Sequence, residues 1–240
     1  IQAGDRIAIF LAQGLETALA HLATYKIGAI AMPLFTLFGT DALRYRLNDS
    51  GASTLITDQQ GLETLLPLRE HLPQLKHLYQ SDSQQDQGEA LSLWQAIAAH
   101  PEPAPRTLNT HAVDPAVLIY TSGTTGSAKG ALHAHRVLLG HLPGVEMSHN
   151  FLPTGEGLMW TPADWAWTGG LMDALLPSLY FGRPIVAYNG RFSPELAFTL
   201  MQEHGVTHSF LFPTALKAMM KAVPAPRERQ QQELPPAPAR

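Results

Sequence analysis

The segment Thr121–Gly130, TSGTTGSAKG, follows the apolar run Val117–Tyr120, which we predict to be a buried strand. It contains five hydroxyl side chains, three glycines and one lysine. Glycines let the backbone curl until successive N–H groups converge on an anion, and the hydroxyls add further donors. Lys129 adds a positive point charge that suits phosphate. A plain turn is the alternative interpretation, but the density of donors favours a phosphate-binding loop.

The spacing of the loop excludes the best-known phosphate loop. A Walker A motif reads G-x-x-x-x-G-K-[ST]. Here Gly123 and Gly126 are separated by two residues, two more precede Lys129, and Gly130 stands where Ser or Thr would be required. A P-loop kinase or NTPase is therefore disfavoured.

Composition narrows the class of protein. The 240 residues are 45% apolar and 15% charged, which suits one large or two small packed α/β domains. The net charge of −4 gives no basic field for nucleic acid or an anionic membrane. The absence of cysteine excludes disulfides, thiolate metal sites and a cysteine nucleophile, and fits a reducing, cytoplasmic location. No apolar run of about 18 residues exists, so no membrane span is expected.

Strand-like and helix-like patterns alternate along the chain, which predicts an α/β fold of mainly parallel sheets with helices on both faces. The helix expected at Glu16–Ile27 has Ala18, Leu19, Leu22 and Ala23 on one face, and Pro143-Gly144 is expected to break or kink a helix at Val137–Met147. A proline-rich connector is expected at about 100–112. The strands are expected at Arg6–Ala12, Ala29–Leu34, Ser53–Thr57, Lys76–Tyr79, Val117–Tyr120, Leu158–Thr161, Ile185–Tyr188 and Ser209–Phe212, and the other helices at Ala42–Leu47, Gly61–Arg69, Glu89–Ala99, Leu171–Leu179, Pro194–His204 and Ala215–Lys221.

The loop resembles the signature loop of the adenylate-forming acyl-CoA synthetases, Ser/Thr-Ser-Gly-Ser/Thr-Thr-Gly-x-Pro-Lys-Gly. Every defined position matches except Ala128, which stands where the family usually has proline. The resemblance continues in the family's order over about residues 4–221. The further matching segments are Gly4–Ile9 (GDRIAI), Lys26–Ile30 with Pro33-Leu34, Asp49–Ala52, Ile56–Asp58, Trp160–Trp167 (WTPADWAW) and Phe212–Leu216 (FPTAL). The tryptophan-rich segment is typical of the acetyl- and medium-chain branch.

The resemblance implies an ATP-dependent carboxylate:CoA ligase for a short- to medium-chain acid. ATP, Mg²⁺ and coenzyme A would be its substrates with the carboxylate. Lys129 and the loop would neutralise the ATP phosphates, and a contact of Thr125 with Mg²⁺ is the one metal contact considered within this chain. The phosphate-binding residues implied are Thr121, Ser122, Gly123, Thr124, Thr125, Gly126 and Lys129.

Three further groups of residues are candidates by pattern. Two tryptophans near Asp164 could simply complete a core, but the resemblance places Trp167, Thr168 and Gly169 at the acyl pocket. His133 and His135 would share a face if they lie on a strand, and the pair alone does not indicate a metal site. The resemblance favours a role in supporting the loop. Asp173 begins a helical pattern, where the helix dipole suffices to explain it.

The resemblance ends near residue 221. The segments expected next, for adenine, ribose and a C-terminal catalytic lysine, have no counterpart here, so no complete catalytic set is expected. We predict a partial AMP-binding N-terminal domain at residues 1–221 and a Pro/Gln-rich disordered extension at 222–240. The chain is expected to be an N-terminal fragment, inactive alone. A non-catalytic phosphate- or nucleotide-binding scaffold, a degenerate short gene product and a phosphotransferase of another class remain as alternatives.

Overall fold

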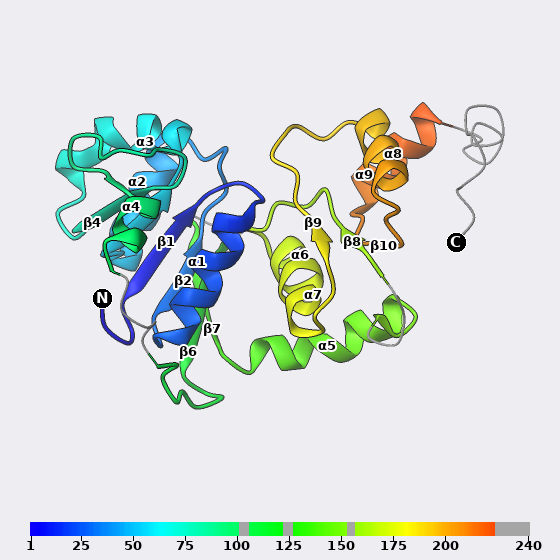
Figure 1. Cartoon of the computed structure of the whole chain (residues 1–240), viewed down its shortest axis with the longest axis horizontal. Helices are drawn as coiled ribbons and strands as arrows, with labels where there is room; N and C mark the ends of the chain where they lie inside the picture. Colours follow the sequence, from blue (N-terminus) through cyan, green and yellow to red (C-terminus); the bar gives the residue numbers. More distant parts are fainter. Residues whose placement is uncertain (101–105, 122–126, 153–156, 224–240) are drawn as a thin grey trace.

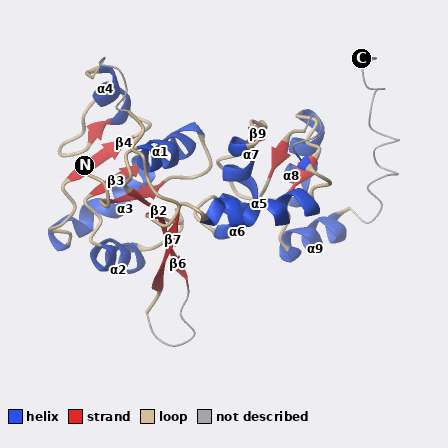
Figure 2. Ribbon diagram, turned by 90° about the horizontal axis from the view of Figure 1, so that it is seen from below, coloured by secondary structure: helices blue, strands red, loops and turns tan. Residues whose placement is uncertain are grey.

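The computed structural model describes residues 1–100, 106–121, 127–152 and 157–223. Within them, one sheet has the strand order β5-β4-β3-β1-β2-β6-β7. Its neighbours are parallel except β6 and β7, which form an antiparallel ribbon that extends beyond helix α2 (Figure 2). The strands are β1 (Arg6–Phe10), β2 (Ile30–Pro33), β3 (Thr54–Thr57), β4 (His77–Gln80), β5 (Leu91–Ser92), β6 (Pro115–Thr121) and β7 (Lys129–Ala134). The predicted, mainly parallel α/β fold is confirmed.

Helices cover both faces of this sheet because side chains of a strand alternate between its faces. Ala8 and Phe10 of β1 pack with α2 (Thr40–Ser50), α3 (Gln59–Leu65) and the 3₁₀ segment η1 (Leu66–His71). Ile9 of the same strand packs on the opposite side. Its partners there are α1 (Leu15–Lys26), the π-helical turn η3 (Leu171–Leu175) and α7 (Leu176–Tyr180).

A second, smaller sheet lies beyond the helices that cover one face of the large sheet. Its parallel strands have the order β10-β8-β9 and span His208–Ser209, Met159–Trp160 and Ile185–Val186 respectively. Met159 packs toward η3 and α5 (Val137–Ser148), whereas Trp160 packs toward α8 (Pro194–Glu203) and α9 (Pro213–Ala222). The described part of the chain therefore has alternating helix and sheet layers, with α1, η3 and α7 between the two sheets (Figure 1).

The buried face of α1 is not the apolar face expected from the sequence. Leu19 and Leu22 are 42% and 41% exposed, whereas Thr17, His21 and Thr24 are buried. The Thr24 hydroxyl donates to the Ala20 carbonyl oxygen at 2.6 Å, so a threonine can be buried with its polar atom satisfied by its own helix. His21 contacts the Tyr25 hydroxyl at 3.0 Å, and burial lowers its pKa to about 3, so this imidazole is neutral at pH 7.

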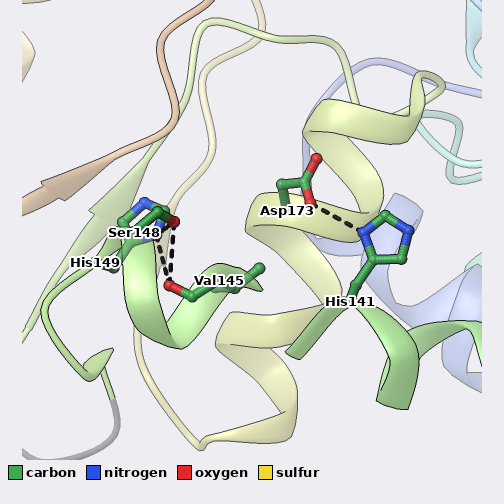
Figure 3. A network of polar contacts seen from close by, with 5 residues as sticks. All are labelled: His141, Val145, Ser148, His149 and Asp173. Atoms are coloured by element: carbon green, nitrogen blue, oxygen red, sulfur yellow. Dashed lines mark hydrogen bonds and ion pairs between the residues drawn. The ribbon is translucent and has the colours of Figure 1, made fainter. Parts of the chain in front are cut away.

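Helix α5 continues through Pro143, so the helix is not broken there, and the expected kink stays a prediction. Contacts on both sides of the proline hold the helix: Val145 is buried beyond it, and His141 before it approaches Asp173 with 3.0 Å between Nδ1 and Oδ1 (Figure 3). Asp173 therefore has a specific partner, His141, on another helix. The sequence alone had suggested only a favourable interaction of Asp173 with its own helix dipole. Ser148 Oγ donates to the Val145 carbonyl at 3.2 Å near the helix end.

Other differences concern element boundaries. The helix expected at Glu89–Ala99 begins later, because β5 occupies Leu91–Ser92 and the Ser92 side chain caps α4 (Leu93–Ala98) by accepting from Gln95 N. The helix expected at Leu171–Leu179 consists of α6 (Thr168–Gly170), η3 and α7. None of the described helices is long and apolar enough to cross a membrane.

Candidate functional site

The two stems of the glycine-rich loop are the adjacent ends of β6 and β7. Thr121, the last residue of β6, pairs with Lys129, the first residue of β7. Lys129 is exposed and forms no ion pair within the described residues. The predicted phosphate-binding residues Ser122, Gly123, Thr124, Thr125 and Gly126 lie outside the described residues. The structure thus places the lysine beside the loop with its charge unpaired in the described part of the chain.

Two tyrosines hold these stems on helix α2. The Tyr45 hydroxyl donates to the carbonyl oxygen of Ala128 at 2.9 Å, directly before Lys129. The Tyr120 hydroxyl donates to Asp49 Oδ2 at 2.6 Å, and burial with this hydrogen bond raises the tyrosine pKa above its usual value. Ala128 also packs on the core below α2. The helix therefore fixes both ends of the loop.

A stack of side chains connects this stem to the predicted acyl pocket. The Arg46 guanidinium lies 4.0 Å from the centre of the Phe38 ring and 5.6 Å from that of Tyr120. Phe38 in turn packs edge-on against Trp167, with 6.0 Å between ring centres. Phe35 completes the aromatic cluster at 5.4 Å from Trp167. The structure thus brings together the two candidate groups, the loop stem and the tryptophan, which lie 46 residues apart by the numbers of Thr121 and Trp167.

The glycines after Trp167 leave little space for a side chain. A Cβ atom at Gly169 would lie 2.6 Å from the Phe210 ring, and one at Gly170 would lie 2.2 Å from the carbonyl oxygen of Asp164. Thr168 and Gly169 begin the short helix α6. Trp167 is 38% exposed, so it does not simply complete a core, whereas Trp165 is 2% exposed and does.

Asp164 is an acidic residue three positions before Trp167. Its Oδ1 accepts from Ala166 N at 2.8 Å. Burial raises the pKa of its carboxyl to about 6, although the hydrogen bond from Ala166 acts in the opposite direction. Desolvation outweighs the single backbone donor here, because a charged carboxylate loses more hydration on burial than one N–H replaces.

The two histidines after the loop have different surroundings. His133 is on β7 and pairs with Val117 of β6. His135 lies just beyond the strand and packs edge-on against Tyr25, with 6.1 Å between ring centres. The described residues contain no group of three or more His, Cys, Asp or Glu side chains arranged to hold a metal ion. A role in supporting the loop stays a prediction for both histidines.

Sequence reasoning missed several residues of this region. Tyr45, Arg46, Phe38 and Phe210 belong to no motif, and only the fold brings them to the loop stem and the pocket. Gln13 is also new: its side chain bonds to the backbone of three residues near the pocket, Thr161, Ala163 and Tyr188. The aromatic pair Phe35 and Phe38, which follows β2 closely and is half-buried in the structure, was the one available signal.

The fold and this site define an α/β protein in which the stem of the glycine-rich loop and the aromatic cluster at Trp167 lie at the two ends of one stack of side chains. A sequence model described as "AMP-binding enzyme" matches residues 1–237. The chain belongs to the AMP-binding enzyme family.

Curated relatives and solved structures agree with this assignment. The acetyl-coenzyme A synthetase of Bacillus subtilis is 30% identical over 222 residues, which cover 92% of this chain and 38% of the relative. That of Halorhodospira halophila is 30% identical over 246 residues, covering 92% and 36%. A crystal structure of a Brucella canis acyl-CoA synthetase has a TM-score of 0.77 at 26% identity, covering 92% of this chain and 40% of that one. The anthranilate CoA ligase AuaEII, solved with anthranoyl-AMP, matches in fold with a TM-score of 0.77 at 24% identity, covering 91% and 42%. The chain thus spans about two fifths or less of these relatives.

Proposed function

We propose that this chain supplies the phosphate loop and the acid pocket of an ATP-dependent carboxylate:CoA ligase. The observation that carries the proposal is the stack Tyr120–Arg46–Phe38–Trp167, which joins the loop stem to Trp167 beside the proposed acid pocket. A reaction between a carboxylate and ATP requires both anions at one place, and in this proposal the two ends of the stack would each receive one of them. The names of the relatives, acetyl-coenzyme A synthetases, are consistent with a short acid.

The proposed chemistry has two steps. A carboxylate oxygen attacks the α-phosphorus of ATP, and pyrophosphate leaves; the thiol of coenzyme A then attacks the acyl carbon, and AMP leaves. Lys129, the loop amides and Mg²⁺ would neutralise the negative charge of the departing pyrophosphate, which is electrostatic stabilisation. Thr121 and the residues Ser122–Gly126 would donate to phosphate oxygens, and Thr125 would contact Mg²⁺.

The pocket has features of a site for short- to medium-chain acids. The Phe210 ring lies where a side chain of residue 169 would project, so this ring would form one wall of the pocket at Gly169. Trp167, which is partly exposed, would offer an apolar wall. In the same proposal, residues 1–221 belong to an AMP-binding N-terminal domain with a connector at about 100–112, residues 222–240 form an extension, and the protein works in the cytoplasm.

Two measurements test this function. The 240-residue chain is titrated with ATP and Mg²⁺, followed by calorimetry, and we expect binding that Lys129→Ala weakens. A chimera in which residues 1–221 replace the matching part of the Bacillus subtilis relative is then assayed for carboxylate-dependent exchange of pyrophosphate into ATP. We expect exchange with short- to medium-chain acids. Nucleotide binding without exchange for any acid would contradict the ligase and favour the scaffold interpretation.

A further inference from the structure

Gln13 joins the carboxyl end of the large sheet to the turn that precedes the acid pocket. It lies three residues beyond Phe10, the last residue of β1. Its Nε2 donates to the carbonyl oxygens of Thr161 at 3.0 Å and Ala163 at 2.8 Å. Its Oε1 accepts from Tyr188 N at 3.1 Å. One side chain thus holds the chain after β1, the turn after β8 and the chain after β9.

The chemistry of these bonds requires an amide. Two donors face two carbonyl groups, and one acceptor faces an N–H, and of the common side chains of this length only glutamine offers both kinds of atom. Glutamate would place a carboxylate against the carbonyl oxygens of Thr161 and Ala163. Methionine would fill a similar volume with no donor.

The contact reaches the pocket through Ala163. Its carbonyl oxygen accepts from Gln13, and the same oxygen lies 2.7 Å from where a Cβ at Gly170 would be. The backbone of Gly170 therefore packs directly on the group that Gln13 holds. Trp167 N donates to the Asp164 carbonyl oxygen at 3.1 Å, which fixes the tryptophan to the same turn.

We propose that Gln13 is a positioning residue for the acid pocket, acting through the Thr161–Ala163 turn to set where Trp167, Thr168 and Gly169 lie. This inference rests on the proposed function, because it assigns the pocket to the acid. A residue that only stabilised the fold would affect the whole chain when changed. A positioning residue affects the turn and the acid response and leaves the loop stem at Lys129 as it is.

The test compares Gln13→Glu, Gln13→Met and the control Gln202→Glu, at an exposed glutamine in α8, in the 240-residue chain. Amide hydrogen exchange is measured for segments 158–170 and 185–190 and for β6. Butanoate and hexanoate are titrated in the presence of ATP and Mg²⁺, with tryptophan emission as the signal. We expect faster amide exchange in the two segments for both Gln13 variants and unchanged exchange in β6. Acid affinity should be weaker by about tenfold, because carbonyl oxygens left without donors destabilise the turn that positions Trp167.

A pH series adds a readout specific to the amide. Protonated glutamate can donate one O–H to a carbonyl, so the exchange difference between Gln13→Glu and wild type should shrink between pH 7.5 and pH 5, whereas that of Gln13→Met should not. If amide exchange in residues 158–170 is the same in the Gln13 variants as in wild type, or is accelerated equally throughout the chain, the positioning role is overturned. Acid binding by wild type is not affected by that outcome. Absence of any acid response in wild type overturns the acid pocket and the role together.

Discussion

The Tyr45 hydroxyl holds the carbonyl oxygen of Ala128 at 2.9 Å, one residue before the only lysine of the signature loop. Ala128 stands where the resembling loops usually have proline, a residue that restricts the backbone by itself. In this chain the restriction comes from α2 instead, through a hydrogen bond and through packing of Ala128 on the core. The position of Lys129 is thus set from outside the loop.

Removing this hydroxyl is expected to loosen the stem. For Tyr45→Phe we expect weaker binding of ATP with Mg²⁺ and a loss of unfolding free energy of about 1 kcal/mol, typical of one hydrogen bond. The measurement is calorimetric titration together with urea unfolding. Tyr79→Phe on β4 is the matched control, because the Tyr79 hydroxyl forms no hydrogen bond within the described residues. Equal effects of the two variants on nucleotide affinity would show that Tyr45 does not position the stem.

Lys129 is expected to contribute to nucleotide binding and not to the unfolding free energy of the chain. Its side chain is exposed, so Lys129→Ala should change the unfolding free energy by less than about 0.5 kcal/mol. Nucleotide affinity should fall by about tenfold or more, because a charge-assisted contact to phosphate is lost. Lys217→Ala, at another exposed lysine on α9, controls for the change in net charge. A lysine without a phosphate role would leave the two variants indistinguishable.

Much of the fold could be predicted because its signals are local. The alternation of apolar runs and helical patterns indicated the parallel sheet, and the loop indicated its own position after β6. The buried face of α1 could not be predicted this way, because Leu19 and Leu22 are exposed while Thr17 and Thr24 are buried, each with its hydroxyl donating to a nearby backbone carbonyl oxygen. Apolar periodicity assumes that polar side chains avoid burial, and Thr24 does not need to.

The candidate site could be predicted only in part, because several of its contacts join residues that lie far apart in the sequence. The family resemblance implied Trp167, Thr168 and Gly169, and the structure connects Trp167 to the loop stem through Phe38 and Arg46. Tyr45 contacts a residue 83 positions away, and Gln13 contacts one 175 positions away. No spacing pattern reports such a contact, since it depends on which strands become neighbours.

Gly169 is expected to tolerate no side chain unless Phe210 moves. The Cβ of Gly169→Ala would lie 2.6 Å from the Phe210 ring, so we expect a loss of about 1–3 kcal/mol in unfolding free energy. Phe210→Leu in the same chain should recover part of this loss. In the chimera, Gly169→Ala is expected to shift the exchange activity toward shorter acids.

Gly140→Ala is the matched control for the glycine change. Nothing lies within 4 Å of a Cβ at this position in α5, so it should stabilise the chain by up to about 1 kcal/mol through helix propensity. Urea unfolding is measured for Gly169→Ala, for Gly169→Ala with Phe210→Leu, and for Gly140→Ala. The comparison separates the steric clash with Phe210 from the general effect of replacing a glycine. An unaltered acid-length profile for Gly169→Ala would contradict its assignment to the pocket.

Asp164 gives the stability of the chain a specific dependence on pH. Its pKa is about 6 in the folded chain, above the ordinary value of 3.8, because burial favours the neutral carboxyl. Its stabilising contribution is therefore complete below about pH 4, and it is lost as the pH rises toward 6. Asp164→Asn cannot ionise, and its side-chain oxygen still accepts from Ala166 N. We expect the variant to exceed wild type in unfolding free energy at pH 7.5 by at most about 3 kcal/mol, the equivalent of this pKa difference. Urea unfolding at pH 4, 6 and 7.5 measures the gap, which should close at pH 4, and Asp41→Asn, at a carboxylate that is 92% exposed, controls for the loss of one charge. A gap that stays constant from pH 4 to 7.5 would mean that burial does not penalise the Asp164 carboxylate.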